Sequence, residues 1–437
     1  MTNVALTGLA RDLARRADEG KPVRIGLIGC GEMGTDIVTQ VAQMRGIEVA
    51  AIADTQPGRA MAAIETAGLP ADSAKETKRP SGLIAAIEDG KTAITAVSEL
   101  AATCELVDVV IDATGKPAVG AEIGLTAMEH GKHLVMMNVE ADVTIGAYLK
   151  DAAARLGVVY SLGAGDEPSS CMELIEFVSA MGHTIVAAGK GKNNPLNHDA
   201  VPDDYREEAE RRNMNPRMLV EFVDGSKTMV EMAAIANATG LVPDKPGMHG
   251  PSASREELSS VLCPVEDGGV LSRKGVVDFT VGKGVAPGVF VIAEMAHPRL
   301  RERMNDLKLG AGPYYTFFRP YHLTSLEVPL TCARAVLYGK ADMVPLDRPV
   351  AEVCALAKRD LKPGERLDAI GETTYRSWIM TAGDARNQGA IPCGLLEGGS
   401  VTAPIGKGEL ITYTNAAVEP GSKLAELRAR QDELVLD

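Results

Sequence analysis

The sequence predicts an α/β protein with three parts: a doubly wound parallel sheet in residues 1–160, an α+β central part in residues 161–344, and a small β-rich module in residues 345–437. Short apolar strands alternate with helical patterns in the first part, which is typical of a parallel sheet. A glycine-rich turn follows the first strand directly. The end of the chain instead holds short strands between Pro/Gly turns. We expect the last helix of the central part to return to the parallel sheet.

The composition excludes several classes of function. Hydrophobic residues make up 45% of the chain and charged residues 24%, as in a globular protein with a real core. No apolar run reaches the roughly 20 residues that span a bilayer, and the amphipathic N-terminus lacks the apolar stretch of a secretion signal. A net charge of −14 argues against nucleic-acid or membrane partners. The seven cysteines form no C-x-x-C pair and fit a reducing cytoplasm, where we expect the protein.

The first strand and its turn carry the strongest local signal. Residues 23–28 read as a buried strand, and Gly29-Cys30-Gly31-Glu32-Met33-Gly34 follows at once, before a helical pattern. This is the G-x-G-x-x-G turn of a Rossmann domain in its required context. Gly29 permits the turn, Gly31 lets the backbone approach a pyrophosphate, and Gly34 allows close helix–strand packing. With Glu32 and Met33, these glycines are the expected dinucleotide-binding turn.

The second strand points to the ribose of a nicotinamide dinucleotide. Residues 47–53 end in Asp54, about 20 residues past the last glycine, where a ribose-binding acid is expected. Asp54 favours NAD(H), because a carboxylate repels a 2′-phosphate. Arg59 lies five residues on and favours NADP(H), or is an exposed helix arginine. Both cofactors stay open at this point.

Two further strands place polar residues at the same sheet edge. Residues 106–113 form a strand that ends in Thr114 and Gly115, and a helix at 118–130 leads to a strand at 133–137. Ligands in open α/β sheets bind beyond such carboxyl ends. We therefore expect Thr114, Gly115, Asn138 and Glu140 to line the nicotinamide cleft. The alternative for Asn138, Glu140 and Asp142 is a helix N-cap region.

An acidic loop follows the strand at 158–162. It contains Asp166 and Glu167 among glycines and serines, and loops of this kind beyond a strand tend to be functional. The two carboxylates are candidates for acid/base catalysis or for binding a divalent cation. The alternative is that they cap a helix beginning near Ser169.

The central part contains two candidate substrate-binding segments. A strand at 183–189 enters a loop at 190–198, in which Lys190, Lys192, Asn193 and Asn194 are donors for an anion or a carbonyl oxygen. A solvated connection is the alternative. A helix at 228–239, with Glu231 on one face, stops at Gly240.

The second segment is aromatic and lies at 312–323. Within and just after it, Arg319, His322 and Ser325 are candidates for holding a phosphate or carboxylate. A packing histidine is the alternative for His322. The following part changes character near Pro345–Pro349, and the turn sequence Lys-Pro-Gly-Glu at 362–365 is echoed at 403–410.

Taken together, these motifs resemble a known family. The residues that carry the resemblance are the turn at 29–34, Asp-Ala-Thr-Gly at 112–115, Asn-Val-Glu-Ala-Asp at 138–142, Ala-Gly-Asp-Glu-Pro at 164–168, Tyr-His-Leu-Thr-Ser-Leu-Glu at 321–327, Lys-Pro-Gly-Glu at 362–365 and Ile-Pro-Cys-Gly-Leu-Leu-Glu-Gly at 391–398. They look like the homoserine-dehydrogenase-like oxidoreductases that end in a SAF domain. Within that group, the chain is most similar to the deoxyxylulose phosphate reductoisomerase-like enzymes, over nearly its whole length.

The resemblance implies a reaction, a cofactor and a metal. Such enzymes convert 1-deoxy-D-xylulose 5-phosphate to 2-C-methyl-D-erythritol 4-phosphate in isoprenoid biosynthesis, with NADPH and a divalent cation, Mg²⁺ or Mn²⁺. Asp166 and Glu167 are then the candidate metal ligands, and Lys190 and Lys192 polarise the carbonyl or exchange protons. Arg319 and Ser325, with Asn193 or Asn194, hold the phosphate of the small sugar substrate. The C-terminal module is SAF-like, and we expect a homo-oligomer.

Two other functions stay open. A homoserine-dehydrogenase-like NAD(P)-dependent dehydrogenase, acting on a semialdehyde or hydroxy acid, needs no skeletal rearrangement and no substrate phosphate. A non-catalytic dinucleotide sensor needs no acid/base residues. The polar segments at 165–170 and 190–194 argue against the sensor.

Overall fold

The computed structural model describes residues 5–193, 195–212 and 214–436. The chain divides into two compact units: Met1–Asp166 with Leu323–Val344, and Glu167–His322 with Pro345–Asp437. The chain thus returns to its first unit after leaving it. The three ranges expected from the sequence stay a prediction. None of the helices in the described part of the chain combines the length and apolar character that a bilayer-spanning helix needs.

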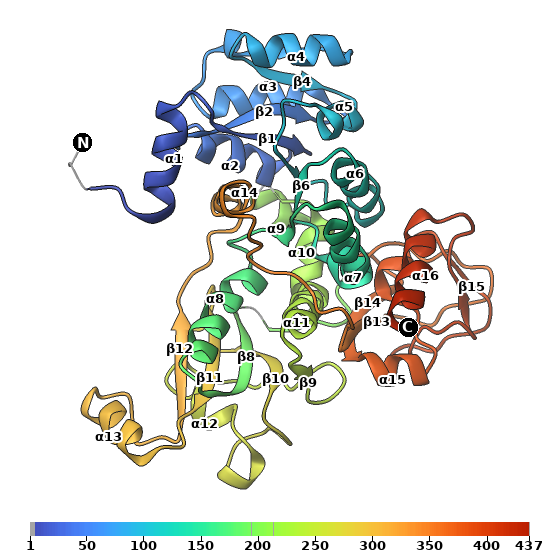
Figure 1. Cartoon of the computed structure of the whole chain (residues 1–437). Helices are drawn as coiled ribbons and strands as arrows, with labels where there is room; N and C mark the ends of the chain where they lie inside the picture. The colour runs from blue at the N-terminus through green and yellow to red at the C-terminus, as the bar shows by residue number, and fades with distance from the viewer. Residues whose placement is uncertain (1–4, 194, 213, 437) are drawn as a thin grey trace. The chain divides into compact units, whose positions relative to one another are not determined.

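The first unit contains a seven-stranded parallel sheet in the order β3-β4-β2-β1-β5-β6-β7, which confirms the predicted doubly wound sheet (Figure 1). Its strands are β1 (Val23–Ile28), β2 (Ile47–Ala53), β3 (Ala74–Glu76), β4 (Thr92–Thr95), β5 (Val109–Asp112), β6 (His133–Met136) and β7 (Tyr160–Leu162). Its helices are α1 (Gly8–Asp18), α2 (Glu32–Val41), α3 (Pro57–Thr66), α4 (Pro80–Glu88), α5 (Ser98–Thr103), α6 (Pro117–Glu129), α7 (Val139–Leu156) and α14 (Val328–Tyr338).

Two apolar layers hold this sheet, one on each face. Leu27 packs with Ile37 of α2 and Val328 of α14 in one layer. Val110 packs with Leu83 of α4 in the other. Strands covered on both faces need apolar side chains throughout, which is why the sequence shows continuous apolar runs here.

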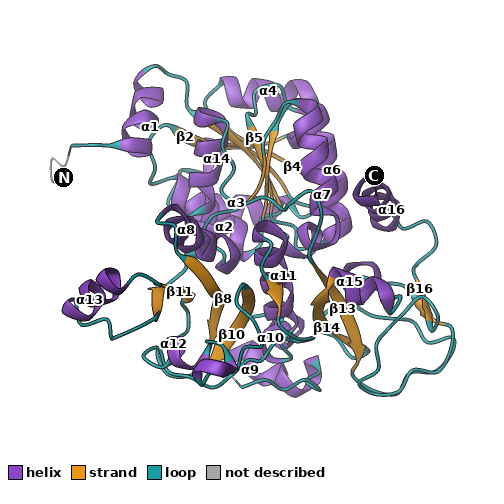
Figure 2. Cartoon of the chain, turned by 60° about the horizontal axis from the view of Figure 1, so that its bottom comes forward, coloured by secondary structure: helices purple, strands orange, loops and turns teal. Residues whose placement is uncertain are grey.

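The second unit is built on a five-stranded mixed sheet in the order β12-β11-β8-β10-β9 (Figure 2). Its strands are β8 (Thr184–Lys192), β9 (Val242–Pro243), β10 (Val276–Val281), β11 (Val289–Glu294) and β12 (Tyr314–Arg319). Its helices are α8 (Glu167–Ala180), α9 (Arg206–Arg211), α10 (Pro216–Val223), α11 (Ser226–Thr239), α12 (Leu258–Val261) and α13 (Pro298–Asp306). β8 runs parallel to β10 and antiparallel to β11.

The C-terminal part of this unit is rich in short strands, as predicted. β13 (Ala351–Ala357) pairs with β14 (Tyr375–Thr381), and β15 (Ser400–Val401) pairs with β16 (Ala416–Ala417). Two helices, α15 (Ala382–Asn387) and α16 (Lys423–Leu436), complete it.

Two boundaries near the candidate site differ from the sequence prediction. The predicted loop at 190–198 is wrong in its first residues, because β8 continues through Lys192. α8 begins at Glu167, slightly earlier than expected. Two glycines explain the longer strand: a Cβ at Gly189 would lie 1.6 Å from the carbonyl oxygen of Asp278, and one at Gly191 would lie 2.1 Å from that of Val285. The Gly-Lys alternation therefore belongs to a strand with close neighbours, not to a loop.

We predict that Gly189→Ala destabilises the protein strongly, whereas Gly58→Ala does not. The alanine methyl at Gly189 would collide with backbone of β10, which cannot move without disturbing the sheet, so we expect a loss of at least about 2 kcal/mol. Gly58 lies in α3 with open space around its Cα, so alanine there should be neutral or stabilising. Thermal unfolding midpoints measure both variants, and equal midpoints would contradict the packing described for β8.

Candidate active site

In the turn between β1 and α2, the protein's own packing requires two of the three glycines and leaves open space at the third. Gly29 has φ +91°, and a Cβ there would lie 2.6 Å from the carbonyl oxygen of Ala113. A Cβ at Gly34 would lie 2.4 Å from the carbonyl oxygen of Gly29. A Cβ at Gly31 would meet nothing within 4 Å. The protein's own packing therefore requires Gly29 and Gly34, while Gly31 leaves space at the start of α2, where a phosphate binds in such folds.

Asp54 lies directly after β2 and is hydrogen-bonded to the glycine turn. Its carboxylate accepts hydrogen bonds from the backbone N–H of Cys30 and of Gln56, both at 2.8 Å. Arg59 is exposed on α3, and Glu32 and Met33 are exposed in the first turn of α2. Among the described residues of this unit, the contacts of Asp54 and the exposed Arg59 therefore do not select NAD(H) over NADP(H).

The ends of β5 and β6 hold the residues expected near the nicotinamide. Asp112 accepts hydrogen bonds from the backbone N–H and hydroxyl of Thr114, at 3.1 and 2.7 Å, and so fixes the turn before Gly115. Burial raises the pKa of Asp112 to about 6, although the bonds from Thr114 act in the opposite direction. A Cβ at Gly120 would lie 2.1 Å from its second oxygen, so a glycine is needed there.

Asn138 is the N-cap of α7, and its side chain accepts a hydrogen bond from the backbone N–H of Ala141. The sequence left this capping role open. The buried Nδ2 of Asn138 has no hydrogen-bond partner among the described residues, so a cofactor contact stays a prediction. Glu140 is half-buried in the first turn of α7. Asp142 is buried and accepts a hydrogen bond from the Tyr160 hydroxyl at 2.6 Å, and burial raises the pKa of its carboxyl to about 6.

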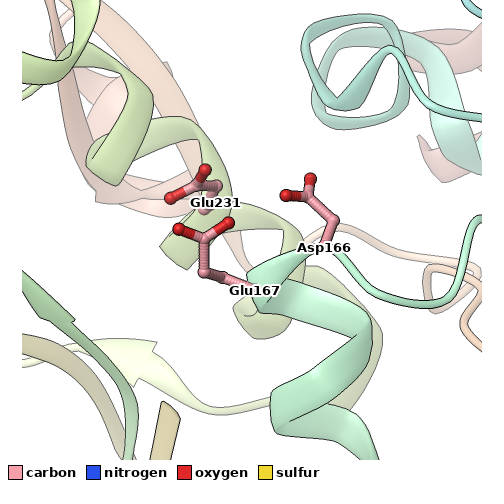
Figure 3. A group of neighbouring side chains, drawn as sticks. All are labelled: Asp166, Glu167 and Glu231. Atoms are coloured by element: carbon pink, nitrogen blue, oxygen red, sulfur yellow. The ribbon is translucent and has the colours of Figure 1, made fainter. Parts of the chain in front are cut away.

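A buried cluster of charges lies in the second unit. Glu167 comes from the start of α8, Lys190 from β8 and Glu231 from α11. The Lys190 ammonium donates to Glu167 Oε1 at 2.7 Å and to Glu231 Oε2. The Lys190 and Glu231 side chains are 6% and 1% exposed, so both charges lie almost entirely outside water. Figure 3 shows the carboxylates of Glu167 and Glu231 beside each other.

The two carboxylates keep Lys190 charged. Burial alone would lower the pKa of Lys190, but attraction to Glu167 and Glu231 outweighs burial and raises that pKa above its usual value. A buried ammonium is stable only when paired in this way. Lys190 is therefore a fixed positive charge rather than a proton-exchanging group.

Lys192 has the opposite character. It lies two residues along β8, and alternate residues of a strand share a face. Its ammonium donates to the carbonyl oxygen of Phe222. Burial and the nearby Lys190 charge lower the pKa of Lys192 to about 8, against partial compensation from Glu231 and Asp224. A lysine with such a pKa exchanges protons near neutral pH, as a general acid or base must.

Three more side chains surround the cluster. Lys227 Nζ lies 3.9 Å from Glu231 Oε1, one helical turn away on α11. His322 Nε2 lies 3.5 Å from Glu167 Oε2, and its Nδ1 lies 2.8 Å from the carbonyl oxygen of Pro287. Asp166, the residue before Glu167, completes a group with Glu231 in which the carboxylate ligand atoms lie within 4.8 Å of one another. Oxygen donors of this kind suit Mg²⁺ or Mn²⁺.

Sequence reasoning did not assign a role to Glu231 and missed Lys227. Glu231 was visible as a lone acid inside the apolar run Met229-Val230-Glu231-Met232-Ala233 of α11. A buried acid needs a partner, so this position in an otherwise apolar helix was the available signal.

The remaining predicted residues are placed as follows. Arg319 pairs with Glu173 at 2.9 Å, and its guanidinium lies over the ring of Tyr321. Asn193 is exposed just after β8, and Asn194 lies outside the described residues. Ser325 belongs to the first unit and donates to Asp36 at 3.0 Å, so its predicted role in phosphate binding has no support from a contact in the second unit.

Two family models match the chain, and their ranges cover the glycine turn and the Lys–Glu cluster. Residues 29–162 match the NAD binding domain of homoserine dehydrogenase. Residues 165–328, which include the Lys–Glu cluster, match the catalytic domain of oxidoreductase DRL. The chain is an NAD(P)-dependent oxidoreductase. No curated protein matches the sequence as a whole or in part.

Solved structures resemble the chain only remotely. A probable dehydrogenase from Thermotoga maritima is 14% identical, with 73% of this chain and 90% of that chain covered and a TM-score of 0.42. The apo scyllo-inositol dehydrogenase from Lactobacillus casei is 12% identical, with 73% and 89% covered and a TM-score of 0.42. A DOX-P reductoisomerase in complex with magnesium is 12% identical, with 73% and 70% covered and a TM-score of 0.38.

We predict that Gly31→Val abolishes dinucleotide binding while the protein still folds. The Cβ of valine would meet no protein atom within 4 Å, but the side chain would occupy the place of the pyrophosphate. Calorimetric titration with NADH and NADPH measures the loss, and the unfolding midpoint of the variant serves as the control. Unchanged cofactor affinity would contradict the assignment of this turn.

Proposed function

We propose that the protein reduces and isomerises 1-deoxy-D-xylulose 5-phosphate to 2-C-methyl-D-erythritol 4-phosphate with NADPH. The observation that carries the proposal is the buried Lys190 ammonium between Glu167 and Glu231, with Lys192 on the same strand. A fixed charge and a proton-exchanging group are both needed when a carbonyl compound rearranges and is then reduced. The match to the catalytic domain of oxidoreductase DRL and the resemblance of the whole sequence support the same reaction.

The proposed reaction has two stages. In the first, a hydroxyl proton leaves the substrate, a carbon–carbon bond migrates to the ketone carbon, and the former ketone oxygen takes up a proton, which gives a branched hydroxyaldehyde. In the second, the nicotinamide transfers a hydride to the aldehyde carbon, and a proton is added to its oxygen. Lys190 stabilises the negative charge that develops on oxygen in both stages. Lys192 takes up the hydroxyl proton and passes it to the former ketone oxygen. Once reprotonated by solvent, it donates a proton to the reduced oxygen.

The acidic group fits the divalent cation that the resemblance implies. Glu167 and Glu231 each give one oxygen to Lys190, and each has a second carboxylate oxygen. The second carboxylate oxygens of Glu167 and Glu231, together with the carboxylate of Asp166, would hold Mg²⁺ or Mn²⁺. When bound there, the cation would supply further positive charge for vicinal substrate oxygens.

The substrate phosphate would meet basic and amide groups of the second unit. Arg319 and His322, with Asn193 or Asn194 after β8, are our candidates for binding it. Arg319 already pairs with Glu173. The phosphate, which carries close to two negative charges, would compete with that single carboxylate.

A dehydrogenase acting on a semialdehyde or hydroxy acid is the second candidate. The match of residues 29–162 to the NAD binding domain of homoserine dehydrogenase favours it. It would use the same Lys192 as acid and base but needs no rearrangement. A non-catalytic sensor is disfavoured by the cost of keeping three charged side chains buried without a chemical use.

The substrate test separates these candidates. We expect the purified protein to oxidise NADPH with 1-deoxy-D-xylulose 5-phosphate in the presence of Mg²⁺ or Mn²⁺, and EDTA to stop the reaction. Unphosphorylated 1-deoxy-D-xylulose is the matched control and should react far more slowly, because it lacks the group that Arg319 binds. Activity on an unphosphorylated semialdehyde, without activity on the sugar phosphate, would establish the dehydrogenase instead.

A pH profile tests the role of Lys192. Its pKa lies near 8 in the folded protein, so it is protonated below that pH and neutral above it. Lys192 must be neutral to accept the hydroxyl proton and protonated to donate to the aldehyde oxygen. With the branched aldehyde supplied as the substrate, only the second role is needed, so kcat should fall as pH rises through about 8. In Lys192→Arg the guanidinium stays protonated and donates poorly. We expect kcat of this variant to fall by about 10²–10⁴-fold and to lose that pH dependence, with NADPH affinity unchanged.

The matched control for this profile is Lys245→Arg, a lysine-to-arginine change at an exposed position of the same unit. It should keep the wild-type rate and the wild-type profile. A Lys192→Arg variant with the same falling limb near pH 8 would assign that limb to another group.

A further inference from the structure

The C-terminal part of the second unit, residues 345–437, packs on α11, the helix that carries Glu231. β13 and β14 lie beside this helix (Figures 1 and 2). Residues 222–226 connect α10 to α11, and we call them the α10–α11 turn. Asp224 and Ser226 in this turn are polar and buried, so both need partners inside the protein.

Lys358, directly after β13, is the partner of Asp224. Its Nζ lies 2.7 Å from Asp224 Oδ2, and the two side chains are 2% and 0% exposed. The same ammonium donates to the backbone carbonyl oxygens of Ala200 and Glu372, each at 2.8 Å. Without this ammonium the Asp224 carboxylate would be an uncompensated charge in the interior. The conformation of the α10–α11 turn therefore depends on the C-terminal part of the chain.

A hydrogen bond from β14 holds the other side of the turn. The backbone N–H of Ser377 donates to Ser226 Oγ at 2.9 Å. The backbone N–H of Ser226 in turn donates to Asp224 Oδ1 at 2.8 Å. Gly225 lies between them with φ +89°, a conformation that glycine adopts without strain. The C-terminal part thus holds the turn at two successive polar residues on either side of a glycine.

The same turn contacts Lys192, the proposed proton-exchanging group. The Lys192 ammonium donates to the backbone carbonyl oxygen of Phe222, the first residue of the turn. α11 begins at Ser226 and carries Glu231, the partner of Lys190. The α10–α11 turn therefore connects the C-terminal part to the surroundings of both lysines of β8.

We infer that Lys358 is a positioning residue for Lys192. Lys358 holds Asp224, and Asp224 holds the turn whose Phe222 carbonyl oxygen accepts from the Lys192 ammonium. The three N–H groups of Lys358 already face three oxygens, so Lys358 acts only through the protein. The inference rests on the proposed role of Lys192 as acid and base. It holds for either candidate substrate, because both reactions would use that lysine.

Asp224 also acts on Lys192 through its charge. Burial and the charge of Lys190 on the same strand lower the pKa of Lys192, whereas the carboxylates of Glu231 and Asp224 raise it. Removal of the Asp224 charge would therefore lower the pKa of Lys192 further. A contact that only stabilises the fold would leave that pKa in place.

Turnover of a variant without the ion pair tests the inference. Lys358→Met/Asp224→Asn lacks both charges, so no uncompensated charge stays in the interior and the protein should fold. A displacement of about 1 Å at a reacting group can cost about 10²-fold in rate. We expect kcat of NADPH oxidation to fall by about 10²-fold with NADPH affinity unchanged. Amide hydrogen exchange of residues 222–228 should become faster, because the turn has lost an anchor.

Lys407→Met is the matched control. Lys407 also joins the C-terminal part to the segment after β8, because its Nζ lies 2.6 Å from Asp199 Oδ2. These two side chains are 57% and 59% exposed, and an exposed pair contributes little to stability. The control should keep the wild-type kcat and hydrogen exchange. Fluorescence of Trp378, the single tryptophan, reports whether β14 stays folded in every variant.

A pH profile of Asp224→Asn separates positioning from a purely structural role. The substrate in this assay is the branched aldehyde, or the semialdehyde for a dehydrogenase. The falling limb near pH 8 should move to lower pH by about one unit, because Lys192 loses one of the two carboxylates that raise its pKa. A structural defect alone would lower kcat at every pH and leave the limb in place.

Lys192→Arg, measured in the same assays, distinguishes a failure of this inference from a failure of the proposed function. If Lys192→Arg is slow, either a wild-type kcat in Lys358→Met/Asp224→Asn or an unmoved limb in Asp224→Asn would overturn the inference alone. A wild-type rate in Lys192→Arg would overturn both, because there would be no catalytic lysine to position.

Discussion

The second unit depends on one ammonium group, that of Lys190, held between Glu167 and Glu231. These three side chains come from α8, β8 and α11, so the ion pairs fix two helices against the central strand of the sheet. Removing any one of them leaves an uncompensated charge in the interior, which costs about 3–5 kcal/mol. Apolar residues in their place would hold the same elements together at a lower desolvation cost. A gain in stability therefore does not account for these charges.

The backbone of β8 makes this arrangement possible. Gly189 and Gly191 let the neighbouring chain come close on their side, while Lys190 and Lys192 share the other face. Although the two lysines share a face, the pKa values of their ammonium groups shift in opposite directions. Lys190 is held charged by two carboxylates, and its charge helps to lower the pKa of Lys192 to about 8. A spacing of two residues on one strand thus produces a fixed charge beside a proton-exchanging group.

In the first unit, the space around each glycine of the turn shows which of them the fold itself requires. Gly29 and Gly34 lie against backbone oxygens, so the fold itself excludes larger residues there. Gly31 is free of such contacts, so the packing of the protein does not itself require a glycine there. Asp54 and Asp112 hold the loops on either side of this turn through hydrogen bonds to backbone N–H groups. The binding loops are thereby fixed before a cofactor arrives.

The sequence by itself determined the parallel sheet of the first unit, its glycine turn and the helix that stops at Gly240, because these features depend on local periodicity and turn chemistry. It also picked out Glu167, Lys190 and Lys192 by residue type. Only the tertiary structure decided that both lysines lie on a strand, that Glu231 and Lys227 join them, and that Asn138 caps a helix. The ion pairs of Lys190 join residues 23 and 41 positions apart, and the strand through Lys192 depends on the backbone of neighbouring strands, and such contacts leave no periodic trace in the chain. The cap at Asn138 is a local contact to Ala141, which the sequence had left open beside a cofactor contact.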